Sequence, residues 1–188
     1  MSELAEQLRI EEYRALRATI RERGSVRFLV TVITFSAWAA GIIAVCSMFF
    51  MPLFSVVPLV VLAAGFEVVL AIHVGVERIG RYIQVHHEPA SAGLARWEQT
   101  AMSASLLSGG INPLLPVPFM AATLVNFALS ALLPLDAESR ASALWSGLPT
   151  AILHIAFVAR VAMAARFAAG QRAADLREFE RVLQNPKN

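Results

Sequence analysis

The chain has 188 residues, of which 57% are hydrophobic and 16% are charged, and its formal net charge is +2. Soluble domains carry about a quarter charged residues and roughly 45–50% apolar ones, so this composition is typical of a membrane protein. It leaves no room for a separate soluble domain, and we expect no nucleic-acid partner. The single cysteine, Cys46, excludes an internal disulfide and a CxxC redox pair.

Residues 1–27 are predicted to form a cytoplasmic amphipathic helix. Its apolar residues recur at intervals of three to five, with Glu and Arg on the other face: Leu4, Leu8, Tyr13, Leu16 and Ile20. Such a helix can lie on anionic lipid or pack against a partner helix, and both alternatives remain open. The long apolar run follows only near residue 28, which is not the pattern of a secretory signal peptide.

Four apolar stretches follow, each long enough to cross a bilayer core, which takes about 20 residues of helix. The predicted spans are residues 28–50, 53–76, 113–134 and 143–164, within a transmembrane domain of residues 28–165. The turn at Met51-Pro52 is so short that the first two spans must be antiparallel neighbours. The predicted fold class is therefore all-α, a polytopic membrane protein with a four-transmembrane-helix bundle.

Three of the helices are expected to extend beyond the membrane into the cytoplasm. The second has no helix breaker between Pro58 and Pro89, so it would reach about 50 Å. Residues 166–188 form a charged, helical tail whose apolar stripe comprises Leu176, Phe179 and Leu183. Between them, residues 94–107 resemble a short surface helix in which Trp97 suits a headgroup-level anchor.

Arginine and lysine concentrate in the two terminal arms and the middle loop, whereas the connector at residues 134–142 contains only Arg140. The positive-inside rule then places both termini in the cytoplasm, with the chain in the cell (inner) membrane. The abundance of arginine and alanine is typical of a GC-rich bacterial gene. The terminal helices are too short to bury their apolar stripes alone, so we expect a homo-oligomer.

The second helix carries an ordered polar stripe. At 100° per residue, its polar residues fall within an arc of roughly 140°. A stripe this regular must face protein or water rather than lipid. Its members are Glu67, His73, Glu77, Arg78, Arg81, Gln84 and Glu88.

Glu67 lies within the second predicted span, and a carboxylate at membrane depth is paired, protonated or functional. Arg160 lies at a similar depth on the fourth span, which favours a Glu67–Arg160 ion pair. A protonatable or cation-binding Glu67, or one whose carboxylate reaches the interface, are the alternatives.

His154 on the fourth span and Asn126 on the third lie at comparable heights. An interhelical hydrogen bond between them is the expected arrangement. A proton-relay role for His154 is the alternative.

No metal or cofactor is predicted. His73 and Glu77 share a helix face, but His86 and His87 point about 100° apart. The chain has neither HExxH nor paired Glu-x-x-His motifs. A bis-His haem is disfavoured because His73 and His154 differ by about 15 Å in depth. Phosphate-loop and GxSxG signatures are also absent.

These observations predict a small multi-pass protein that forms a homo-oligomeric channel-like, transporter-like or membrane-effector assembly, with the lipid bilayer and further copies as partners. The polar stripe would line a water path. The alternative is a membrane enzyme acting on a lipid-borne or metal-bound substrate at the cytoplasmic interface. Its candidate residues are His73, Glu77, His86, His87 and Glu98. The missing catalytic signatures favour the non-enzymatic assembly.

Overall fold

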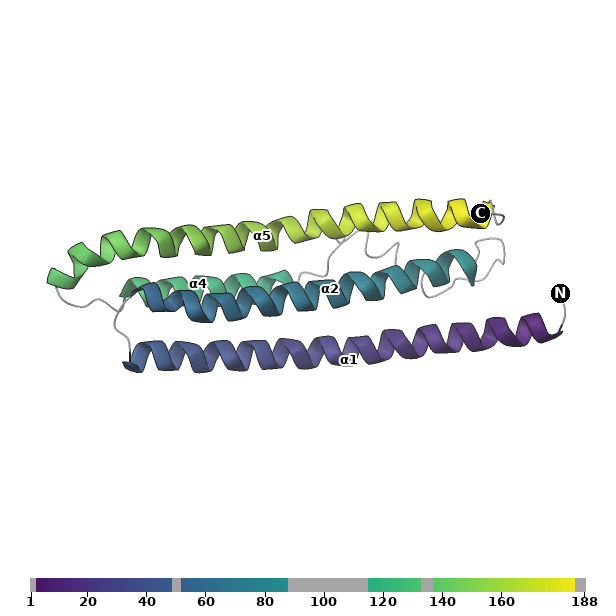
Figure 1. Cartoon of the computed structure of the whole chain (residues 1–188), viewed down its shortest axis with the longest axis horizontal. Helices are drawn as coiled ribbons and strands as arrows, with labels where there is room; N and C mark the ends of the chain where they lie inside the picture. The colour runs from purple at the N-terminus through teal and green to yellow at the C-terminus, as the bar shows by residue number, and fades with distance from the viewer. Residues whose placement is uncertain (1–2, 49–51, 88–114, 133–136, 185–188) are drawn as a thin grey trace. The chain divides into compact units, whose positions relative to one another are not determined.

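The computed structural model describes residues 3–48, 52–87, 115–132 and 137–184, and within these ranges the chain is helical and forms no strand. The helices are α1 (Glu3–Met48), a short 3-10 helix (Pro52–Ser55), α2 (Val56–His86), α4 (Pro116–Leu132) and α5 (Ala137–Gln184) (Figure 1). By length and composition α1, α2 and α5 could each cross a membrane, and α4 is a shorter apolar helix. The all-helical class is confirmed, and a fourth crossing remains a prediction.

The amphipathic segment 1–27 and the predicted span 28–50 form one helix, α1. Gly24 lies inside it, but a glycine costs only about 1 kcal/mol relative to alanine in a helix. That cost is too small to divide a helix of 46 residues. The terminal arm is thus a direct continuation of the first span.

Helix α5 likewise combines the predicted fourth span with the charged tail, and it begins earlier than expected. Its start at Ala137 lies in the segment that we expected to be a connector, residues 134–142. Pro149 lies inside the helix, where it removes one backbone hydrogen bond without ending the helix.

Proline explains how α2 and α4 begin. Pro58 is the third residue of α2, and Pro116 and Pro118 are the first and third residues of α4. The first N–H groups of a helix have no intrahelical acceptor, so proline loses nothing there. We expected α4 to begin at Asn112-Pro113, which lies outside the described residues. So do Glu88, Glu98 and the surface helix expected at residues 94–107.

The chain divides into two compact units. Unit 1 comprises Met1–Phe28, Leu70–Ile111 and Ala165–Asn188, and unit 2 comprises Leu29–Val69 and Asn112–Ala164. Outside residues 134–142, the sequence of unit 2 contains only two charged residues, Glu67 and Arg160. The two units defined by contacts therefore also differ in charge, because nearly all charged residues of the chain belong to unit 1.

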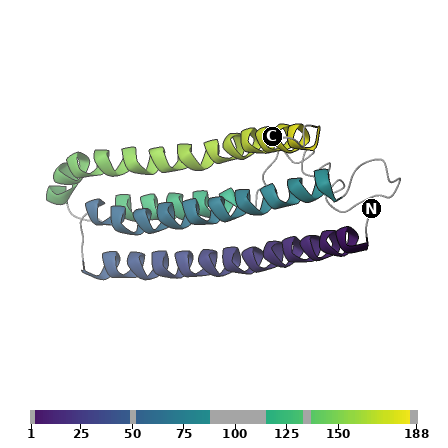
Figure 2. The ribbon, with the colours of Figure 1, turned by 45° about the vertical axis from the view of Figure 1, so that its right-hand side comes forward.

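Unit 2 has an aromatic core. The ring of Phe66 on α2 lies 5.2 Å from Phe119 on α4 and 5.9 Å from Phe157 on α5, measured between centroids. Within this unit α1 and α2 lie side by side and antiparallel (Figures 1 and 2). They approach closely at Gly65, where a Cβ atom would collide with the side chain of Thr34.

Unit 1 has a core of a different kind. Alongside the buried apolar residues Ile83 and Ala168, its interior contains Arg81, Arg172 and Asp175, each at most 5% exposed. Buried charges are tolerated only when they are paired and hydrogen-bonded. The contacts of these residues therefore decide how the unit holds together.

Candidate functional site

The polar stripe of α2 is shared between the two units. Glu67 belongs to unit 2, where its side chain is 49% exposed, whereas Glu77 and Arg81 belong to unit 1, where their side chains are 19% and 0% exposed. Glu77 and Arg81 are thus covered by protein, whereas Arg78 in the same unit has a side chain that is 56% exposed. In unit 2, the first stripe residue, Glu67, lies open on the surface of one copy.

The ion pair expected between Glu67 and Arg160 is present in unit 2. Arg160 on α5 donates from Nη2 to Oε2 of Glu67 on α2 at 2.7 Å. The two side chains are 37% and 49% exposed. A single copy therefore pairs these charges without covering them.

The hydrogen bond expected between Asn126 and His154 is also present. Asn126 Nδ2 donates to the backbone oxygen of Ser55 at 2.9 Å and contacts His154 Nε2 at 2.8 Å. His154 Nδ1 lies 2.7 Å from the carbonyl oxygen of Thr150, which can only accept. Nδ1 therefore carries the proton and Nε2 accepts from Asn126. With both ring nitrogens engaged, this arrangement gives the proton-relay alternative no support.

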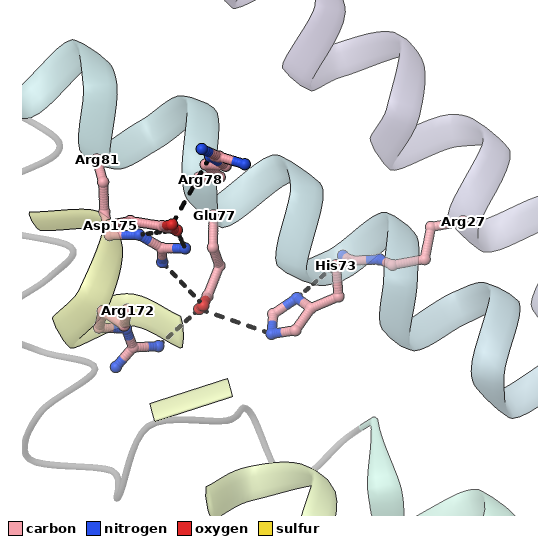
Figure 3. Close-up of polar contacts among 7 residues, drawn as sticks. All are labelled: Arg27, His73, Glu77, Arg78, Arg81, Arg172 and Asp175. Atoms are coloured by element: carbon pink, nitrogen blue, oxygen red, sulfur yellow. Dashed lines mark hydrogen bonds and ion pairs between the residues drawn. The ribbon is translucent and has the colours of Figure 1, made fainter. Parts of the chain in front are cut away.

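In unit 1 four charged residues alternate in sign between α2 and α5, and we call them the charge ladder: Arg172, Glu77, Arg81 and Asp175. Arg172 Nη2 donates to Glu77 Oε1 at 2.7 Å, and Arg81 Nη1 donates to Glu77 Oε2 at 3.3 Å (Figure 3). Arg81 also donates from Nε to Asp175 Oδ2 at 3.1 Å, and its Nη2 reaches the same oxygen. The charge ladder thus contains two cations and two anions, so its charges balance.

Arg78 extends the charge ladder toward solvent. Its side chain is 56% exposed, and it lies 3.7 Å from Asp175 and 3.6 Å from Glu178. Exposed pairs of this kind contribute little to stability. The stabilising contacts are therefore those among the four residues of the charge ladder.

His73 connects α1 to the charge ladder. Arg27 Nη1 on α1 lies 3.2 Å from His73 Nδ1 on α2 (Figure 3). Arginine only donates, so Nδ1 must accept and the ring proton lies on Nε2. That nitrogen faces Glu77 Oε1 at 3.6 Å. The contact with Arg27 thus fixes the tautomer of His73, and the protonated Nε2 is the nitrogen that faces Glu77.

A second cluster joins the three helices of unit 1 beyond the predicted span 53–76. Tyr82 donates to Glu12 at 2.8 Å, its ring lies 5.6 Å from that of Phe179, and His87 Nε2 lies 3.5 Å from Glu12. Burial, the hydrogen bond to Glu12 and the charge of Glu12 raise the pKa of Tyr82. Burial, then the neighbouring His87, lowers the pKa of His86, partly offset by Glu12.

Sequence reasoning missed the partners of the stripe, Arg172 and Asp175 on the tail. Their spacing offered a signal, because residues 172, 175, 176 and 179 recur at intervals of three and four on one helix face. Of the remaining stripe residues, Gln84 is half-buried and its Oε1 finds no hydrogen-bond partner among the described residues. Glu88 lies outside those residues.

The described residues bring together no group of three His, Cys, Asp or Glu side chains that could hold a metal ion. His73 and Glu77 lie together, but the two carboxylate oxygens of Glu77 accept from two arginines. No family model matches the chain, and neither a curated protein nor a solved structure matches it.

Proposed function

We propose that the chain is a multi-pass integral membrane protein that works as a non-catalytic assembly of several copies, channel-like or transporter-like. The observation that carries this proposal is the Glu67–Arg160 pair, which is about half exposed on one copy. A charged side chain at the bilayer centre costs about 3 kcal/mol. Both residues lie within predicted spans, so either another copy or a water path must cover the pair.

The distribution of charge supports insertion of unit 2 into the membrane. Its helical segments outside residues 134–142 contain no charged residue besides Glu67 and Arg160. Exposed apolar side chains are frequent on its described helices, including Leu124 at 62% and Ile155 at 68%. Lipid would cover these side chains without any further protein.

The membership of unit 1 supports four crossings with both termini in the cytoplasm. Unit 1 gathers both terminal arms and the loop after α2, together with all arginines and lysines except Arg140 and Arg160. If α1, α2 and α5 each cross once, the two ends of the chain share one side only if α4 crosses too. Helix α4 has 17 described residues, or about 25 Å. The positive-inside rule then assigns the arginine-rich side to the cytoplasm, in the inner membrane of a bacterium.

The enzyme alternative has weaker support. A general base or metal ligand needs a free lone pair directed at its substrate. Glu77 is engaged by two arginines, and His73 Nδ1 accepts from Arg27. Two of the residues expected to act at the interface, His73 and Glu77, are thus already engaged by arginine side chains.

Cysteine accessibility in native membranes tests the proposal. In a Cys46→Ser background, Ala64→Cys places a thiol on the exposed side of α2, one turn from Glu67. Leu124→Cys on α4 is the matched control at an exposed position expected to face lipid. A charged, membrane-impermeant thiol reagent should label the first and spare the second. Mass spectrometry of the purified protein should show more than one copy.

Two results would overturn the proposal. One is equal protection of both cysteines from the reagent in a protein that is monomeric by native mass spectrometry. Neither a second copy nor water would then contact the Glu67–Arg160 pair. Release of the chain from membranes by alkaline carbonate would show that it is not integral.

A further inference from the structure

An open groove lies in unit 1 between α1 and α2. Its volume is about 490 Å³, and it is lined by Thr19, Glu22, Arg23 and Val26 on α1 and by Ala71 and Ile72 on α2. This volume is in the range of small-ligand sites. Polar groups therefore line the groove from one helix and apolar groups from both.

The polar groups have defined hydrogen-bonding roles. Thr19 donates its hydroxyl proton to the backbone oxygen of Ala15 at 3.0 Å, so it offers the groove only lone pairs. The carboxylate of Glu22 also only accepts, and the guanidinium of Arg23 only donates. In the part of the chain that the structure describes, neither Glu22 nor Arg23 forms an ion pair. The groove thus presents an acceptor pair beside a cation.

The guanidinium of Arg23, which lines the groove, comes close to α2 at Gly75. Its Nη1 lies only 2.9 Å from the position that a Cβ atom on Gly75 would occupy, which is too close for a residue with a side chain. A glycine inside a helix is otherwise unfavourable by about 1 kcal/mol relative to alanine. Gly75 gives the guanidinium room to approach the α2 backbone.

We propose that this groove binds the headgroup of a phosphoethanolamine phospholipid. The phosphate binds Arg23, and the ammonium donates to Thr19 and Glu22. The proposal rests on the proposed membrane function, which places Val26 and Ile72 near the ends of the spans 28–50 and 53–76, at the level of lipid headgroups.

The order of residues along α1 matches the order of groups in such a lipid. The acceptors Thr19 and Glu22 precede Arg23, and Val26 lies closest to the predicted span. In a phospholipid the ammonium is outermost, and the phosphate lies between it and the glycerol and acyl chains. A lipid inserted in the bilayer therefore meets each partner in sequence.

The same chemistry discriminates among headgroups. A trimethylammonium group has no N–H, so a choline lipid cannot donate to Thr19 and Glu22. A glycerol lipid carries a negative charge without a cation, which leaves Glu22 facing an anion. The expected order of affinity is ethanolamine, then choline, then glycerol headgroups.

Native mass spectrometry of the full-length protein, titrated with phosphatidylethanolamine, phosphatidylcholine and phosphatidylglycerol of identical acyl chains, tests this order. Arg23→Gln should weaken ethanolamine-lipid binding about tenfold, since it removes a charge-assisted hydrogen bond. Glu22→Gln should abolish the preference for ethanolamine over choline. Arg21→Gln and Glu6→Gln make the same charge changes on exposed positions of α1 outside the groove and should change neither.

Equal binding of the three lipids, or preference for phosphatidylglycerol, would overturn the inference. So would an Arg21→Gln effect as large as that of Arg23→Gln. Full competition by soluble glycerophosphoethanolamine at equal concentration would assign the groove to a soluble ligand. Because carbonate extraction and cysteine labelling test the membrane function separately, an inserted protein without lipid selectivity would overturn this inference alone.

Discussion

Neutralising Asp175 should release the α5 tail from α2. The side chain is 8% exposed and accepts two hydrogen bonds from Arg81, which is fully buried. Breaking a buried pair costs about 3–5 kcal/mol. In Asp175→Asn the amide oxygen still accepts and Arg81 keeps Glu77, so we expect the lower end of that range. A cost of about 3 kcal/mol corresponds to roughly a 100-fold increase in opening of the tail.

Hydrogen exchange of the detergent-solubilised protein, followed by mass spectrometry, measures this opening. Amides of residues 172–184 should exchange roughly 100-fold faster in Asp175→Asn, and those of residues 147–164 should not change. Glu180→Gln is the matched control, because Glu180 is exposed on the same helix. An acceleration below about threefold, or an equal effect of Glu180→Gln, would refute the reasoning. Arg81→Gln should add to Asp175→Asn only the loss of the bond between Arg81 and Glu77, since both changes break the contact between Arg81 and Asp175.

Three further changes test other contacts. Gly65→Ala should lower stability by about 1–3 kcal/mol, because the added Cβ collides with Thr34, and Thr34→Ala in the same chain should restore it; thermal unfolding in detergent measures both. Asn126→Ala should cost about 1–2 kcal/mol in the same assay, since it removes hydrogen bonds to two other segments. Glu12→Gln should lower the pKa of Tyr82 toward 10.0, measured by phenolate absorbance in a chain whose other tyrosine is phenylalanine.

Each of these three predictions has a contrary outcome. A Gly65→Ala chain that Thr34→Ala does not rescue would show that the close approach of α1 and α2 is not the cause. An unchanged melting temperature in Asn126→Ala would mean that water replaces its bonds. The pKa of Tyr82 is raised on folding, so the stabilisation is present below 10.0 and is lost as pH rises through the folded pKa. A Glu12→Gln chain with an unshifted pKa would contradict this coupling.

The contacts within unit 2 could be predicted from the sequence because a span in lipid, as proposed for these helices, would restrict the alternatives. A charged or polar side chain in a span must find a partner at its own depth, and few candidates exist there. Glu67 with Arg160 and Asn126 with His154 were therefore each paired from their depths in the sequence, and both contacts are present.

The contacts of unit 1 could not be predicted in the same way. Outside a bilayer, water satisfies a free arginine or carboxylate at little cost, so many pairings of the terminal helices were equally consistent with the sequence. The stripe on α2 indicated that a protein or water surface faced it, but not that Arg172 and Asp175 supplied that surface. The early start of α5 was missed because charged residues at 136–140 resemble a connector while remaining compatible with a helix.

The charge ladder also constrains the order in which the molecule can be made. Arg81 and Asp175 are 94 positions apart, and Glu77 and Arg172 are 95 apart. During synthesis the α2 residues therefore leave the ribosome long before their partners exist. Water can solvate them throughout this delay if unit 1 lies outside the bilayer. Under that placement unit 1 closes last, as the final helix is completed, and its closure marks a chain that has been fully translated and inserted.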